Sequence, residues 1–212
     1  MSTKHLLDTE LLPLLDLYPD RFTFTREMLP RHRSHRAKHI VMGDAERAGV
    51  SRETIKVRGF KGPEVECLLY TPNQKENYNP AYLHIHGGGY VTGSARASDI
   101  SNLNIARKLG ATVLSVDYRL SPECQIPGPL YDCYAGLAWL SENSPSLGID
   151  KNRIAIGGES AGGGLAAALA ILARDRGEYE ICHQHLTYPM LDNLTGSSGH
   201  EGDPLVGEFV WT

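Results

Sequence analysis

Short apolar runs alternate with longer segments of helical periodicity from about residue 54 onward. Two of these runs, separated by Lys61, Gly62 and Pro63, predict an opening β-hairpin: TIKVRGF (54–60) and VECLLYTP (65–72). Four later runs predict further strands: AYLHIH (81–86), ATVLSVDY (111–118), RIAIGG (153–158) and HLTYPM (185–190). The pattern is typical of a sheet with buried strands.

Helical periodicity fills the segments between these strands. Residues 97–110 place Ile100, Leu103, Ala106 and Leu109 on one face and close with Gly110, as a helix with a C-terminal glycine does. Residues 129–143, with Pro129 in the first turn, and the alanine-rich residues 163–177 predict two more helices. Alternating strands and helices of this length predict an α/β fold with a mostly parallel sheet and helices on both faces. Ligands in such sheets bind at the carboxyl ends of the strands.

The first 50 residues differ in kind from the rest of the chain. Their helical segments are interrupted by prolines and do not form βα units. We therefore expect an N-terminal helical cap over residues 1–50 and an α/β core over residues 51–212. The basic run RHRSHRAKH (31–39) is interpreted as a solvated face of this cap rather than as a site for anions.

Composition and charge narrow the possible partners. Formal charge is −4 and the isoelectric point is about 6.1, so a nucleic-acid partner is not expected. The four cysteines lack C-x-x-C spacing, which argues against a disulfide scaffold or a zinc ribbon. The N-terminus has no signal-peptide pattern and no apolar stretch approaches 18 residues, so we expect a cytoplasmic protein without a membrane span.

The strongest chemical signal is the segment GESAG at residues 158–162. It lies where the strand RIAIGG meets the alanine-rich helix, which is the strand-turn-helix setting of a nucleophile elbow. Such an elbow holds its serine in strained backbone geometry and leaves room only for glycine two residues before and after it. We therefore predict Ser160 as a nucleophile, with Gly158 and Gly162 allowing the close approach and Glu159 in a supporting place.

A second signal is HGGG at residues 86–89, where a buried strand opens into three glycines. Glycine sacrifices packing and conformational entropy, so three in succession suggest that a ligand approaches the bare backbone. Acyl transfer needs such backbone donors for the oxyanion of its tetrahedral intermediate. We predict that the amides of Gly87, Gly88 and Ala161 form an oxyanion hole, with His86 and Gly89 supporting the loop.

Three motifs in order, HGGG at 86–89, DYRLSPE at 117–123 and GESAGG at 158–163, resemble the hormone-sensitive lipase family of α/β-hydrolases. The resemblance spans roughly residues 54–212. It implies a cofactor-independent carboxylesterase that acts on a small-molecule ester through an acyl-serine. Asp117, Arg119 and Glu123 of the middle motif are expected to have structural roles.

The same resemblance implies a catalytic acid and a histidine after two further strands, and the sequence does not reach them. We therefore expect an N-terminal part of a longer enzyme, inactive alone, whose last strand leaves an exposed sheet edge for self-association. The apolar run at 209–211 supports this expectation. Asp192 and His200 form an alternative acid and base, in the order Ser, acid, His.

Two further alternatives remain open. Four histidines on or next to predicted strands raise the possibility of a metal site: His84, His86, His183 and His185. Alternating histidines more often satisfy backbone or packing needs, and we predict no metal. A non-catalytic, small-molecule-binding member of the same fold is the alternative to an esterase. The identity of the acid and the base, the acyl length, the alcohol group and the oligomeric state are not readable from the sequence.

Overall fold

The computed structural model describes residues 3–17, 25–74, 78–195 and 197. The chain forms two compact units, residues 1–29 with 192–212, and residues 30–191. In the first unit the described elements are short 3-10 helices, at Lys4–Leu6, Thr9–Leu17 and Arg26–Met28. The predicted apolar run at 209–211 and His200 lie outside the described residues.

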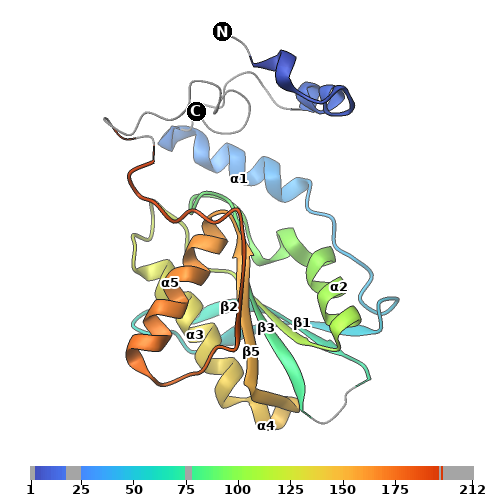
Figure 1. The fold of residues 1–212 in the computed structure, drawn as a ribbon, viewed down its shortest axis with the longest axis vertical. Helices are drawn as coiled ribbons and strands as arrows, with labels where there is room; N and C mark the ends of the chain where they lie inside the picture. The colour runs from blue at the N-terminus through green and yellow to red at the C-terminus, as the bar shows by residue number, and fades with distance from the viewer. Residues whose placement is uncertain (1–2, 18–24, 75–77, 196, 198–212) are drawn as a thin grey trace. The chain divides into compact units, whose positions relative to one another are not determined.

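The second unit is built on a six-stranded sheet (Figure 1). Its strands are β1 (Val50–Val57), β2 (Val65–Pro72), β3 (Asn79–Ile85), β4 (Thr112–Val116), β5 (Ile149–Glu159) and β6 (His183–Thr187). Their order is β1-β2-β4-β3-β5-β6, with antiparallel pairing for β1–β2 and β2–β4 and parallel pairing for the rest. The predicted hairpin, the mostly parallel sheet and the α/β class are confirmed.

Helices cover both faces of this sheet (Figure 1). Helix α2 (Asp99–Leu109), preceded by a 3-10 turn at Ala95–Ser98, packs on one face. Helices α3 (Gly128–Glu142) and α5 (Ala161–Arg176) pack on the other, and the short α4 (Ser144–Leu147) leads into β5. Helix α1 (Leu29–Lys38) lies beyond the carboxyl ends of the parallel strands.

Side-chain alternation along the strands separates two cores. On β3, Leu83 and Ile85 belong to the cluster beneath α3 and α5, whereas Tyr82 belongs to the cluster beneath α2. Leu114 and Val113 divide in the same way on β4. Both faces of the central strands are therefore buried, as expected for a sheet covered by helices on either side.

Helix α2 differs from its predicted orientation. Leu103 and Ala106 are buried as expected, but Ile100 is 48% exposed and Leu109 is 66% exposed. Two polar residues, Asp99 and Asn102, take the buried places instead. Gly110 ends the helix in the left-handed conformation with φ +59°, as predicted.

Buried Asp99 is paired within the α2 face. Arg52 Nη1 donates to Oδ1 at 2.9 Å and to Oδ2 at 2.8 Å, and the Tyr70 hydroxyl donates to Oδ1 at 2.9 Å. The Gly43 amide donates to Oδ2 at 2.6 Å. A buried carboxylate is tolerated only with such partners, and Asp99 thereby ties β1, β2 and the segment before β1 to α2.

Candidate active site

Ser160 lies between the last residue of β5 and the first residue of α5. Its backbone has φ 55° and ψ −116°, a conformation that is costly for a residue with a side chain. Three backbone hydrogen bonds hold it: the Ser160 amide donates to Thr187 O at 2.9 Å, and Ser160 O accepts from Gly164 N and Met190 N, each at 3.0 Å. The strand-turn-helix arrangement expected of GESAG is therefore present, and its strain is at the serine.

The two glycines that flank the elbow lie against the end of β3. A Cβ added to Gly158 would overlap Ile85 O and lie 2.8 Å from the carbonyl carbon of Gly162. A Cβ added to Gly162 would also overlap Ile85 O and lie 2.6 Å from His86 O. Side chains at 158 and 162 are thus excluded by backbone atoms, which cannot rotate away, and the main obstacle is the neighbouring strand.

The glycine loop after β3 passes beside the serine. A Cβ added to Gly87 would lie 2.8 Å from Glu159 O and 3.6 Å from Ser160 Cβ. Gly88 and Gly89 have φ of +128° and +62°, so both need the conformational freedom of glycine. Within the described residues, no hydrogen bond is found from the amides of Gly87, Gly88 or Ala161.

A buried histidine holds the residue next to Ser160. His84 Nε2 lies 3.3 Å from both carboxylate oxygens of Glu159. Because a carboxylate only accepts, Nε2 donates, and Nδ1 lies 2.9 Å from Ser115 Oγ and 3.3 Å from Asn102 Nδ2. Burial raises the pKa of Glu159, but the hydrogen bond and the charge interaction with His84 outweigh it and the pKa is lowered.

The sequence predicts a supporting place for Glu159 but does not identify His84 as its partner. The sequence contains a signal for the side of the sheet on which His84 lies. Side chains two residues apart on a strand share a face, so His84 lies with Tyr82 on the face that α2 covers.

His86 supports the glycine loop from below. Its ring stacks on Tyr118 with centroids 4.1 Å apart, and the Tyr118 hydroxyl donates to His86 O at 2.9 Å. The ring Nδ1 lies 2.9 Å from Gly87 O, while Nε2 has no hydrogen-bond partner among the described residues and lies 3.9 Å from Asp117 Oδ1. Burial lowers the pKa of His86 to about 4, so the ring is neutral at pH 7.

The three charged residues of DYRLSPE each have a partner. Asp117 Oδ1 accepts from the Ala95 amide at 2.8 Å. Arg119 pairs with buried Asp132 through its Nε and Nη2 groups. Glu123 pairs with Arg33 of α1. Their contacts join residues 117–123 to the 3-10 turn at Ala95–Ser98, to α3 and to α1, in line with structural roles.

In the described part of the chain, no side chain forms a hydrogen bond with the Ser160 hydroxyl. Asp192, the acid of the alternative pair, accepts from Leu194 N at 2.8 Å and so caps its own turn. No group of three potential metal ligands occurs among the described residues, and within the same residues no helix has the length and apolar character to cross a membrane.

Comparison with known proteins identifies the family to which this architecture belongs. A family model described as the alpha/beta hydrolase fold matches residues 82–209, which include the glycine loop and the elbow. The chain belongs to this family. The predicted fold class and the resemblance to the hormone-sensitive lipase group are confirmed, because the similar proteins are esterases with the same fold.

Three relatives illustrate the extent of the similarity. An arylesterase of Saccharolobus solfataricus is 42% identical over 112 residues, covering 53% of this chain and 36% of that protein. Esterase LipI of Mycobacterium tuberculosis is 33% identical over 196 residues, covering 88% of this chain and 58% of that protein. The solved structure of a bacterial heroin esterase superposes with a TM-score of 0.84 at 37% identity, covering 94% of this chain and 63% of that one. This chain thus spans about half the length of the curated relatives it matches.

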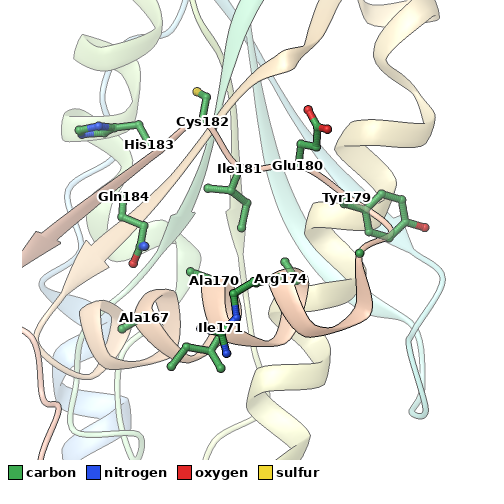
Figure 2. A pocket seen from close by; sticks show the side chains of 12 residues that line it. Ala167, Ala170, Ile171, Arg174, Tyr179, Glu180, Ile181, Cys182, His183 and Gln184 are labelled. Carbon is green, nitrogen blue, oxygen red and sulfur yellow. The ribbon is translucent and has the colours of Figure 1, made fainter.

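A separate groove of about 950 Å³ runs between α5 and the edge strand β6 (Figure 2). Ala167, Ala170 and Ile171 of α5 line one side, and Ile181, His183 and Gln184 line the other. None of the predicted site residues lines it, so it is not the esterase site inferred from the motifs.

Proposed function

We propose that this chain carries the nucleophile and the oxyanion hole of a serine carboxylesterase. One observation carries the proposal: Ser160 has strained backbone geometry at the start of α5, with Gly87 packed against it. Strain of this kind is retained where a side chain must be held in a working position. The amides at the start of α5 and in the glycine loop, which donate no hydrogen bond within the described residues, supply positive potential at the same place.

In the proposed reaction, Ser160 Oγ attacks the carbonyl carbon of a carboxylic ester while its proton passes to a base. The carbonyl oxygen becomes an oxyanion, which accepts hydrogen bonds from the amides of Gly87, Gly88 and Ala161. Collapse of this intermediate breaks the bond to the alcohol oxygen, which takes up the proton and leaves an acyl-serine. Water then releases the acid by the same steps.

The remaining predicted residues have supporting places in this proposal. Gly158 and Gly162 let β5 and α5 approach the end of β3, and Gly89 allows the loop to turn. His86 lies beside the carbonyl of Gly87, and the bond from His84 to Glu159 anchors the residue before the nucleophile. Residues 1–50 are proposed as a cap that shapes the acyl pocket over a core of residues 51–212.

The substrate class follows from the relatives. Similar proteins are named arylesterase, carboxylesterase and ethyl acetate hydrolase, which supports a small-molecule carboxylic ester as substrate. The proposed chemistry uses no cofactor. The proton acceptor for Ser160 is not assigned.

Hydrolysis of p-nitrophenyl butyrate tests the proposal. We expect only a slow rate, little above that of buffer, because a serine without its base keeps only the catalysis that the oxyanion hole and binding supply. Ser160→Ala should remove this rate, and a fluorophosphonate should label Ser160, located by mass spectrometry. Asp175→Ala, at an exposed ion pair on α5, is the control and should retain both signals. Hydrolysis that survives Ser160→Ala, or label on another residue, contradicts the assignment.

A non-catalytic binding protein of the same fold is the second candidate. It is favoured by the observation that the two histidines near the elbow, His84 and His86, contact Glu159 and Gly87 and, within the described residues, form no bond to Ser160. Binding of a butyrate ester by isothermal titration, without turnover or fluorophosphonate labelling, would support it.

Two further proposals concern the cell and the assembly. All four cysteines are free, two of them buried, which supports a reducing, cytoplasmic setting. Strand β6 lies at the edge of the sheet and its first three residues are exposed, which supports self-association by strand pairing. Light scattering after size-exclusion chromatography tests this, with Gln184→Pro expected to lower the apparent mass.

A further inference from the structure

The basic helix α1 directs two of its arginines at the turn that follows the oxyanion glycines. Arg33 Nε donates to Val91 O at 2.8 Å, and its Nη2 donates to Ser121 O at 2.7 Å. The same guanidinium pairs with both carboxylate oxygens of Glu123, each at 2.9 Å. These bonds use the planar fork of the guanidinium and set its direction.

Arg36, three residues further along α1, reaches the end of the same turn. Its Nη1 donates to Thr92 Oγ1 at 3.1 Å, and Thr92 Oγ1 in turn donates to Gly88 O at 3.0 Å. The Thr92 amide also donates to Gly88 O, at 2.9 Å. A continuous series of hydrogen bonds therefore links α1 to Gly88.

The turn at residues 88–92 needs such restraint. Gly88, Gly89 and Tyr90 have φ of +128°, +62° and +64°. The left-handed conformation is unfavourable for a tyrosine and persists only where the surroundings hold it. Ser121 N donates to Tyr90 O at 2.8 Å, and Arg33 bonds the neighbouring carbonyls of Val91 and Ser121.

We propose that Arg33 and Arg36 are positioning residues, which hold the 88–92 turn so that the amides of Gly87 and Gly88 stay directed at Ser160. The inference rests on the proposed function of that site. Oxyanion stabilisation depends on donors that are fixed before the reaction, so a loosened turn weakens it without removing any donor. The basic run at 31–39 is then not merely a solvated face, because two of its arginines hold the loop.

The ion pair with Glu123 contributes less than the carbonyl bonds. The Glu123 side chain is 65% exposed whereas that of Arg33 is 27% exposed. Exposed pairs are screened by water and salt, so the bonds to Val91 O and Ser121 O carry the restraint. Glu123→Gln should therefore disturb the turn less than a change at Arg33.

Hydrogen exchange of the full chain tests the restraint directly. We expect the protected amides of Val91 and Thr92, which donate to Gly88 O, to exchange at least about tenfold faster in Arg33→Met/Arg36→Met, while amides of α5 keep their rates. Arg31→Met is the matched control, since Arg31 is exposed on the same helix. Unchanged exchange at 88–92, or equal acceleration throughout the chain, would overturn the proposal.

Catalysis provides the second readout. In Ser160-dependent ester hydrolysis, Arg33→Met/Arg36→Met should lower kcat by about 10- to 100-fold with little change in KM, because a donor displaced by about 1 Å loses up to that factor. Lysine at position 33 (Arg33→Lys) in place of methionine should recover part of the lost kcat. Faster exchange with an unchanged kcat would show that the turn is held for another purpose and would refute the positioning role. If the unaltered chain neither hydrolyses an ester nor takes the fluorophosphonate label on Ser160, the proposed function fails, and the exchange measurement alone decides whether the arginines restrain the turn.

Discussion

The two faces of the sheet are buried by different chemistry. Beneath α3 and α5 the buried side chains are mostly apolar, with Leu83, Ile85 and Leu169 among them, although Asp132 of α3 is also buried and pairs with Arg119. Beneath α2 the buried set includes Asp99, Asn102 and His84, each hydrogen-bonded. Apolar contacts predominate on the first face, whereas three buried polar residues and their partners hold α2.

The difference has a consequence for the candidate site. Apolar contacts are non-directional, so those beneath α5 stabilise its packing on the sheet and allow the two backbones to approach closely. Hydrogen bonds between buried polar groups are directional and costly to leave unmade. The polar face reaches Glu159 through His84 and therefore fixes the position of the residue before Ser160.

The largest expected effect is on the polar face. Asp99→Ala leaves Arg52 and Tyr70 without their acceptor, and removing one partner of a buried ion pair costs about 3–5 kcal/mol of the free energy of unfolding. Asp175→Ala on α5 is the matched control, since its pair with Arg174 is exposed and contributes at most about 1 kcal/mol. Urea denaturation followed by circular dichroism measures both. Equal losses of unfolding free energy in the two variants would mean that Asp99 contributes no more to stability than the exposed Asp175.

Protonation of His86 at low pH is expected to lower the free energy of unfolding by about 3 kcal/mol. Its pKa in the folded state, about 4, lies below the usual 6.5, so the unfolded chain binds the proton first as the pH falls. The stability contributed by neutral His86 is complete above pH 6.5 and is lost between about pH 6.5 and 4. Unfolding free energies at pH 7 and 4.5 measure the loss, which His86→Gln should reduce. An identical pH dependence in the variant would contradict the assignment.

Gly162→Ala tests the close approach on the α5 face. Alanine ordinarily stabilises a helix by about 1 kcal/mol relative to glycine, but here its methyl group meets Ile85 O and His86 O. We expect the reverse sign, a loss of about 1–3 kcal/mol in thermal or urea unfolding. A gain in stability would show that β3 and α5 are further apart than described.

The smallest effect is expected on the outer side of α2. Ile100→Ser and Leu109→Ser should each change the free energy of unfolding by no more than about 0.5 kcal/mol, because both side chains are largely exposed. Leu103→Ala, at a site 3% exposed on the same helix, should cost about 2–5 kcal/mol. Comparable losses of unfolding free energy at positions 100 and 103 would support the α2 orientation predicted from apolar periodicity and contradict the one described here.

Features controlled by local backbone geometry were predictable from the sequence. The order of strands and helices, the hairpin, the glycine that ends α2 and the elbow at Ser160 all depend on residues close together in the chain. Glycine, proline and apolar alternation restrict φ and ψ or the buried face within a few residues, so their meaning is legible without the fold.

Tertiary structure alone decided which polar residues are buried and what they hold. Asp99 meets Arg52 across 47 residues, His84 meets Glu159 across 75, and Arg33 meets Val91 across 58. Before its partner is known, a charged residue in a helix is expected at the surface, because burial without a hydrogen bond is unfavourable. Sequence determined where the serine and the glycines stand; only the packing of distant segments supplied the partners that let Asp99 be buried, His84 bind Glu159 and α1 reach the glycine loop.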